Sequence, residues 1–148
     1  MHSALWLRDT AVKRLEKLAW LALLAGRLAV GLLFLSTGWG KVHDVAKVTE
    51  FFASLHIPMP ALNAVVVGYS ELLCGAALIL GLLARLATLP LIVSMIVAIS
   101  TARLADVGGL FDLVGLEEFT YLVLLTMLLI LGPGRASVDG WLSRVRCA

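Results

Sequence analysis

Residues 18–41 read LAWLALLAGRLAVGLLFLSTGWGK, an apolar run whose only charge before its last residue is Arg27. Trp20 and Trp39 stand 19 residues apart, a separation of about 28 Å along an α-helix. That length matches the hydrocarbon thickness of a bilayer, and tryptophan prefers the headgroup boundary on either side of it. The run therefore predicts a transmembrane helix over residues 18–38 that carries an arginine inside the membrane.

The composition extends this prediction to the whole chain. Of its 148 residues, 61% are hydrophobic and only 15% are charged. Soluble domains have about 45–50% apolar and about 25% charged residues, so a soluble globule is excluded, and disorder requires low hydrophobicity. A net charge of +2 without a basic stripe gives no reason to expect nucleic-acid binding. We expect an all-α integral membrane protein with the lipid bilayer as its main partner.

The remaining apolar runs predict a four-helix bundle in a single domain over residues 1–148. The predicted spans are residues 18–38, 62–83, 86–104 and 113–132. The uncharged part of the last run is too short to cross a bilayer and ends at a Gly-Pro-Gly sequence, so counting back about 20 residues draws Glu117 and Glu118 into the span.

Amphipathic stretches flank the spans, and we expect them to lie at the membrane interface. The predicted interfacial helices cover about residues 4–17, 42–56 and 137–145. Eight basic residues fall on the side of both termini and three on the other side. The excess of positive charge predicts that both termini are cytoplasmic.

Arg27 and Glu71 are the two charges deepest in the predicted spans. A central charge costs roughly 2.5–3.5 kcal/mol on insertion scales, so we expect the two side chains to pair at matching depth. Small residues flank both on their helix faces and leave room for helix contact or for a ligand. The predicted pocket is lined by Arg27, Glu71, Phe34, Gly31, Gly68 and Gly75. The alternative is an ion pair that only fixes how two helices meet.

Three further polar residues form a candidate proton relay toward the outer face: Glu118, Tyr121 and Lys41. A carboxyl group held at depth by the short fourth run suits proton exchange. Two alternatives stay open. Glu118 can be a partly hydrated acid at a helix N-terminus, and Lys41 can be a snorkelling anchor.

No intrinsic metal site or cofactor is expected. His43, His56 and Met59 share an outer loop, but their spacing matches no established metal motif, so they are only weak candidates. Cys74 and Cys147 form no CxxC sequence, and all three histidines lie outside the apolar runs, which leaves no intramembrane haem ligands.

Several fragments in order resemble the DoxX family of small four-helix bacterial membrane proteins. They are Arg27–Gly31, Gly38–Lys41, Ile57–Pro60, Glu71 with Gly75, Leu80–Arg85, Gly115–Phe119 and Gly132–Asp139. The family's polar pattern falls on Arg27, Lys41, Glu71 and Glu118. The resemblance implies a location in the bacterial inner membrane. It also implies a role in membrane redox systems, since members include a thiosulfate:quinone oxidoreductase subunit and a partner of detoxifying enzymes at the mycobacterial membrane.

The leading functional prediction is a membrane component of a redox system whose polar pocket binds a quinone or a similar small redox molecule. Without a flavin or metal motif, the chain is at most an oxidoreductase subunit that receives electrons through a soluble or membrane partner. Two alternatives stay open: an accessory protein or transporter for a small solute or metal ion, and a scaffold that recruits soluble oxidoreductases. A homo-oligomer is a further open partner state.

Overall fold

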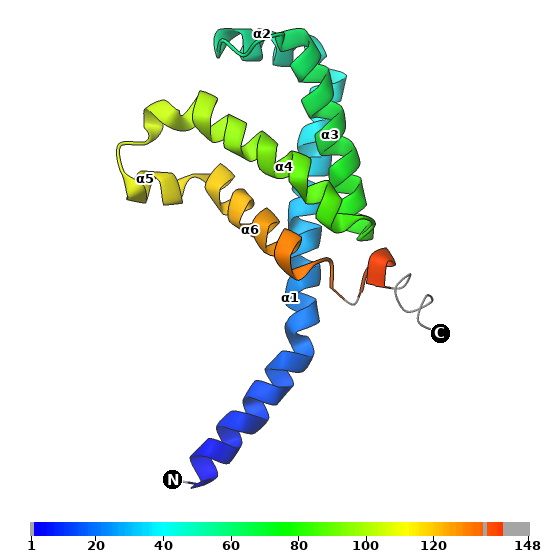
Figure 1. Cartoon of the computed structure of the whole chain (residues 1–148), viewed down its shortest axis with the longest axis vertical. Coiled ribbons are helices and arrows are strands. Elements are labelled where there is room, and N and C mark those ends of the chain that lie inside the picture. The colour runs from blue at the N-terminus through cyan, green and yellow to red at the C-terminus, as the bar shows by residue number, and fades with distance from the viewer. Residues whose placement is uncertain (1, 135, 141–148) are drawn as a thin grey trace.

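The computed structural model describes residues 2–134 and 136–140, and side chains for residues 18–104, 106–134 and 136–140. Throughout these residues the regular structure is helical (Figure 1). Three of the described helices are long and apolar enough to cross a membrane: Leu18–His43, Pro60–Leu80 and Ala84–Arg103. The expected all-α membrane architecture is confirmed at that level, whereas the orientation of the termini stays a prediction.

The first helix, α1, runs without a break from His2 to His43. Its first part covers residues 4–17, which we had expected to form a separate interfacial helix. Neither glycine nor proline occurs between residues 2 and 25, so nothing in the sequence interrupts the helix before the first span. A location of residues 4–17 at the membrane surface remains a prediction.

The second helix, α2, covers Val45–Ser54 and is shorter than the predicted stretch of residues 42–56. The side chain of Asp44 caps it by accepting a hydrogen bond from the amide of Lys47 at 3.3 Å. The next helix, α3, covers Pro60–Leu80, and its first residue is a proline that needs no amide partner there. It ends at Gly81, whose φ of 69° is readily adopted by glycine.

The α4 helix covers Ala84–Ala98 and continues as a π-helical stretch, Ile99–Arg103, and a short 3₁₀ turn, Leu104–Asp106. The predicted third span at residues 86–104 thus lies on continuous helix. The short helix α5, Leu110–Gly115, follows at the end of the bundle far from the α3–α4 turn (Figure 1).

The predicted fourth span needs a correction, because the helix over residues 113–132 is broken. Leu116 is extended, with φ −72° and ψ 136°, and separates α5 from the last helix, α6, at Glu117–Leu131. At 15 residues, α6 is about 22 Å long and shorter than the bilayer hydrocarbon. Glu117 and Glu118 therefore form the first turn of a short helix rather than lying within a longer one.

Helices α1 and α3 lie side by side and antiparallel, and glycines allow their close approach. A Cβ on Gly38 would lie 2.4 Å from the amide nitrogen of Leu72, and one on Gly75 would lie 2.6 Å from that of Leu35. Such close backbone approach through small residues is typical of transmembrane helix pairs.

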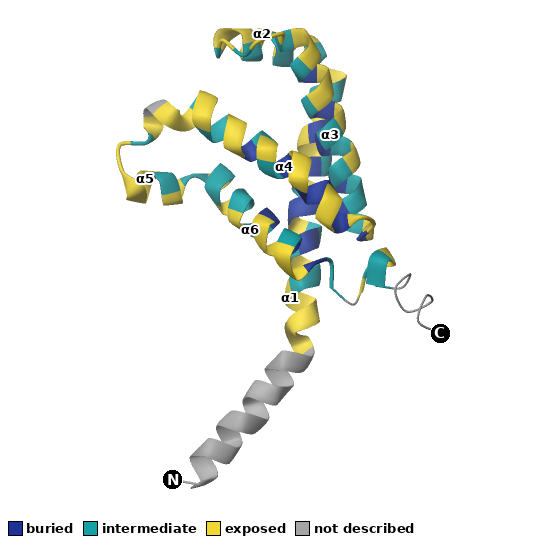
Figure 2. Cartoon of the chain, viewed as in Figure 1, coloured by how far each residue is buried: buried dark blue, intermediate teal, exposed yellow. Residues whose placement is uncertain are grey.

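Helices α4 and α6 form a second pair that leans against the first (Figure 1). Buried residues gather where α1, α3, α4 and α6 meet, while the outward faces of these helices are exposed (Figure 2). The core side chains are Val30, Phe34, Leu78, Ala84, Ala87, Leu91, Met95 and Leu125. Many leucine, isoleucine and valine side chains are exposed on the outside of this small core. Such a large apolar surface is expected where the surrounding solvent is lipid rather than water.

The chain leaves α6 through Gly132, with φ of 81°, and turns back under the α3–α4 connection. Residues 138–140 are helical, in agreement with the start of the helix predicted at residues 137–145. The rest of that predicted helix lies outside the described residues.

Candidate functional site

Glu71 lies at the centre of the site, with 1% of its surface exposed. One carboxylate oxygen, Oε1, accepts a hydrogen bond from Ser94 Oγ of α4 at 3.0 Å. The other, Oε2, accepts from Thr37 Oγ1 of α1 at 3.0 Å and from Nζ of Lys41. A buried carboxylate with a cationic partner and two hydroxyl donors is fully compensated for its loss of water.

The predicted Arg27–Glu71 pair is wrong, because Glu71 pairs with Lys41 instead. Arg27 is buried, with 2% exposed, but its guanidinium donates to two backbone carbonyls of the C-terminal segment. Nη1 lies 2.8 Å from the oxygen of Pro133, and Nη2 lies 2.8 Å from that of Ala136. Arg27 and Glu71 therefore each have hydrogen-bond partners of their own, and they do not pair with each other as the sequence predicts.

The register of α1 against α3 explains the difference. Gly38 faces Leu72, and Gly31 faces Ile79, so each step along α1 corresponds to a step back along α3. The same register brings Arg27 opposite Gly81, where an added Cβ would lie 2.5 Å from Nη1 of Arg27. Ten residues of helix, about 15 Å, separate that point from Glu71.

A second ion pair links the ends of α4 and α6. Arg103 Nε donates to Glu118 Oε1 at 2.9 Å, and Arg103 also approaches Asp106 at 3.7 Å. Arg103 is the last residue of the π-helical stretch, which widens the helix by one residue per turn and changes the direction of its side chain. Such stretches are rare and often lie at functional sites.

The two ion pairs lie beside one cavity of about 170 Å³. Its walls come from α1, α3, α4 and α6, and the lining residues are Leu33, Phe34, Thr37, Lys41, Glu71, Met95, Glu117, Glu118 and Tyr121. The volume is that of roughly six waters in the liquid. The lining combines the apolar side chains of Leu33, Phe34 and Met95 with a buried carboxylate, a lysine ammonium and a tyrosine hydroxyl, so the cavity can hold a single small ring that carries polar groups.

Five of the predicted site residues meet at this cavity: Lys41, Glu71, Phe34, Glu118 and Tyr121. The ring of Phe34 packs edge-on against that of Tyr121, with centroids 6.4 Å apart.

The remaining predicted pocket residues do not line the cavity. Gly31, Gly68 and Gly75 face the opposite helix of the α1–α3 pair, where an added Cβ would lie 2.9, 3.2 and 2.6 Å from its nearest neighbours. They provide helix contact, which was the other role open to small residues beside a charge.

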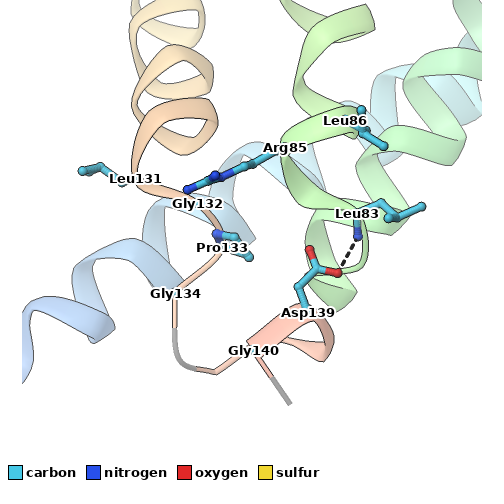
Figure 3. Close-up of a pocket in the computed structure, with 9 residues that line it drawn as sticks. All are labelled: Leu83, Arg85, Leu86, Leu131, Gly132, Pro133, Gly134, Asp139 and Gly140. Carbon is cyan, nitrogen blue, oxygen red and sulfur yellow. Dashed lines mark hydrogen bonds between the residues drawn. The ribbon is translucent and has the colours of Figure 1, made fainter. Parts of the chain in front are cut away.

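Arg27 instead belongs to a cluster at the opposite end of the bundle, between the α3–α4 turn and the C-terminal segment. Asp139 accepts from the amide of Leu83 at 2.9 Å (Figure 3). It also accepts from the amide of Ala84 at 3.1 Å, so it caps α4 from a distant part of the chain. The amide of Asp139 in turn donates to the oxygen of Gly81 at 3.1 Å. An open groove of about 480 Å³ lies beside this cluster, next to Arg85 (Figure 3).

The weak metal candidates lie apart from the cavity. His43 Nδ1 is 2.9 Å from the backbone oxygen of Trp39, and its ring lies against that indole, with centroids 4.2 Å apart. Met59 is exposed and His56 has a positive φ of 57°. Within the described part of the chain, no group of three or more His, Cys, Asp or Glu side chains is placed to hold a metal ion.

Sequence reasoning missed Thr37 and Arg103 as site residues, and Asp139 as a cap. Thr37 lies one helical turn before Lys41, and that spacing was a usable signal. Arg103 is the only basic residue near the end of the third span, but the widened helical turn that directs it to Glu118 leaves no trace in the hydrophobic pattern.

A family model described as DoxX matches residues 22–104. The chain is also 35% identical over 129 residues to an uncharacterised membrane protein of Mycobacterium tuberculosis, Rv3486. That match covers 80% of this chain and 79% of the relative. No solved structure matches the chain significantly. The matched family region includes Arg27, Lys41 and Glu71 but ends before Glu118.

Proposed function

Since the chain belongs to the DoxX family of multi-pass membrane proteins, we propose that it is the membrane component of a redox system. In this proposal the charged cavity binds the ring of a quinone or of a similarly small redox molecule. Electrons come from a partner protein or a diffusible reductant, as the association of the family with membrane redox systems implies.

One observation carries the proposal: a hydrogen-bond donor and an acceptor from different helices line the same small cavity together with apolar side chains. Lys41 presents an ammonium with three N–H groups, and Glu118 presents a carboxylate. A quinone carbonyl accepts from the first, whereas a hydroquinone hydroxyl donates to the second. Leu33, Phe34 and Met95 supply apolar lining, and Tyr121 adds a half-buried aromatic ring.

The buried pair of Lys41 and Glu71 has a positioning role in this proposal. Glu71 holds Nζ of Lys41 at the cavity wall, while its other contacts to Thr37 and Ser94 fix the carboxylate between α1 and α4. A preorganised donor of this kind costs little to order when a ligand binds.

The test is the affinity of purified protein for duroquinone, a compact quinone whose fully methylated ring does not add thiols. We expect Lys41→Met to weaken binding about tenfold and Tyr121→Phe about threefold, as for loss of one charged and one neutral hydrogen bond. Arg85→Gln, in the separate groove, is the control and should bind like the wild type. Equal affinity of all four proteins would remove the cavity from the proposal.

One observation favours transport as a second candidate function. The side chains lining the cavity carry three carboxylates, those of Glu71, Glu117 and Glu118, against the single ammonium of Lys41. An excess of negative charge suits a cation path better than an anion path. Uptake of rubidium or zinc ions by proteoliposomes that contain only this chain would support transport, and sealed proteoliposomes without uptake would contradict it.

A further inference from the structure

Three carboxylates line the cavity, and the two whose side chains are withdrawn from solvent, those of Glu71 and Glu118, differ in how far their hydrogen bonding is satisfied. Both oxygens of Glu71 have donors, from Lys41, Thr37 and Ser94. In Glu118 only Oε1 has one, from Arg103 at 2.9 Å. Its Oε2 is buried and has no hydrogen-bond partner among the described residues. The carboxylate of Glu118 therefore keeps one oxygen without a partner at the wall of the cavity, and a bound molecule can donate to it once a small shift of the side chain opens that oxygen to the cavity.

A buried acceptor of this kind discriminates between ligands. Leaving a buried polar atom without a partner costs about 1–3 kcal/mol, and more for a charged group, so a ligand that donates to it gains affinity. Glu118 is 19% exposed on its side chain and lines the cavity, which places a bound molecule next to the carboxylate. A carbonyl oxygen at the same place would face the carboxylate as a second acceptor and would be repelled.

The donors of the cavity do not discriminate in this way. Lys41 gives one of its three N–H groups to Glu71, and Tyr121 has a hydroxyl that can donate or accept. A carbonyl oxygen and a hydroxyl oxygen can both accept from these groups. Glu117 is exposed and exchanges its hydrogen bonds with solvent, so Glu118 is the half-buried acceptor at which the two redox forms of a quinone differ most.

We infer that the cavity selects the reduced, hydroxyl-bearing form of its ligand, with Glu118 Oε2 accepting the hydrogen bond of the hydroxyl group. This inference rests on the proposed function and adds to it the redox state of the bound molecule. Glu118 acts as the specificity-determining residue, while Arg103 holds its carboxylate in place through the other oxygen.

The test compares the affinities of the purified protein for durohydroquinone and for duroquinone, measured without oxygen. The hydroquinone should bind at least about tenfold more tightly, which corresponds to about 1.4 kcal/mol. In Glu118→Gln the amide oxygen can still accept from Arg103, while the amide nitrogen becomes a donor toward the cavity. The preference should then reverse in favour of the quinone.

Two further variants sharpen the result. Glu50→Gln removes an exposed carboxylate on α2 that does not line the cavity, and it should leave the ratio of the two affinities unchanged within about twofold. Glu118→Asp keeps the charge but withdraws it by one methylene group, so the preference should be lost without reversing. It also serves as the test variant if Glu118→Gln does not fold.

The outcomes separate the inference from the function on which it rests. Equal affinities in the wild type, or tighter binding of the quinone, would overturn the inference and leave the proposed function standing. A preference that persists unchanged in Glu118→Gln would also overturn it, because the acceptor would then lie elsewhere. Binding of neither form by folded wild-type protein would overturn the proposed function itself.

Discussion

Replacing Arg27 by methionine tests the assignment of this buried charge to the C-terminal segment. The variant keeps an apolar stem but loses two charged hydrogen bonds of 2.8 Å, to Pro133 and Ala136. Bonds of this class contribute about 1.5–3 kcal/mol each, and removing a buried guanidinium returns roughly 2.5–3.5 kcal/mol of insertion cost. We expect a net loss of about 2 kcal/mol in the free energy of unfolding.

Two measurements follow this effect. Unfolding in mixed micelles of a mild detergent with increasing dodecyl sulfate gives the stability, with exposed Arg85→Met as the control that should change it by less than about 0.5 kcal/mol. Hydrogen exchange gives the local effect. Release of the segment should detach Asp139 from the amides of Leu83 and Ala84 and speed their exchange about fivefold, as for loss of a helix cap.

A double-mutant cycle between Arg27 and Glu71 separates this arrangement from direct pairing. About 15 Å of helix lies between their contact points, so the coupling free energy of Arg27→Met with Glu71→Gln should be near zero. A coupling above about 1 kcal/mol would refute the register of α1 against α3. Unchanged protection of Leu83 and Ala84 in Arg27→Met would refute the role of the arginine in holding the segment.

Three other predictions follow from contacts in the same structure. Gly38→Ala places a Cβ 2.4 Å from the backbone of Leu72 and should destabilise the protein by about 1–3 kcal/mol in micelle unfolding, whereas Gly40→Ala, with open space around it, should not. Asp139→Ala removes the cap of α4 and should cost about 1 kcal/mol by the same assay; a change near zero would contradict the capping role. Ser94→Ala leaves one oxygen of Glu71 without its donor and should cost about 1–2 kcal/mol by the same assay; an unchanged stability would contradict the role of this hydrogen bond.

The sequence predicted the helix boundaries best where backbone chemistry marks them. Pro60 begins α3, close to the predicted start at residue 62. The predicted end at residue 83 was too late, because the positive φ of Gly81 ends the helix at Leu80. The fourth span failed because its break is poorly marked. Gly115 stands directly before the break at Leu116, but an isolated glycine is tolerated within helices, so it was a weak signal beside the continuous apolar pattern.

The membership of the candidate site was predictable in part, and its pairing was not. Depth singled out Arg27, Lys41, Glu71 and Glu118, and all of these except Arg27 line one cavity. Which charges pair depends on the register of two helices joined through α2, and the length of that connection leaves the register free. The close backbone contact of Gly38 with Leu72 fixes the register of α1 against α3, and the sequence alone does not reveal which residue of α3 a glycine of α1 will contact.

The most direct test of the charged cavity is photoaffinity labelling with an azido-substituted benzohydroquinone, mapped by mass spectrometry of the protein in lipid nanodiscs. We predict labels on the cavity walls, in the α1 segment around Phe34 and in α6 around Tyr121, that free durohydroquinone displaces and that Lys41→Met weakens. Displaceable labelling confined to the groove beside Arg85, with the cavity unlabelled, would contradict the account.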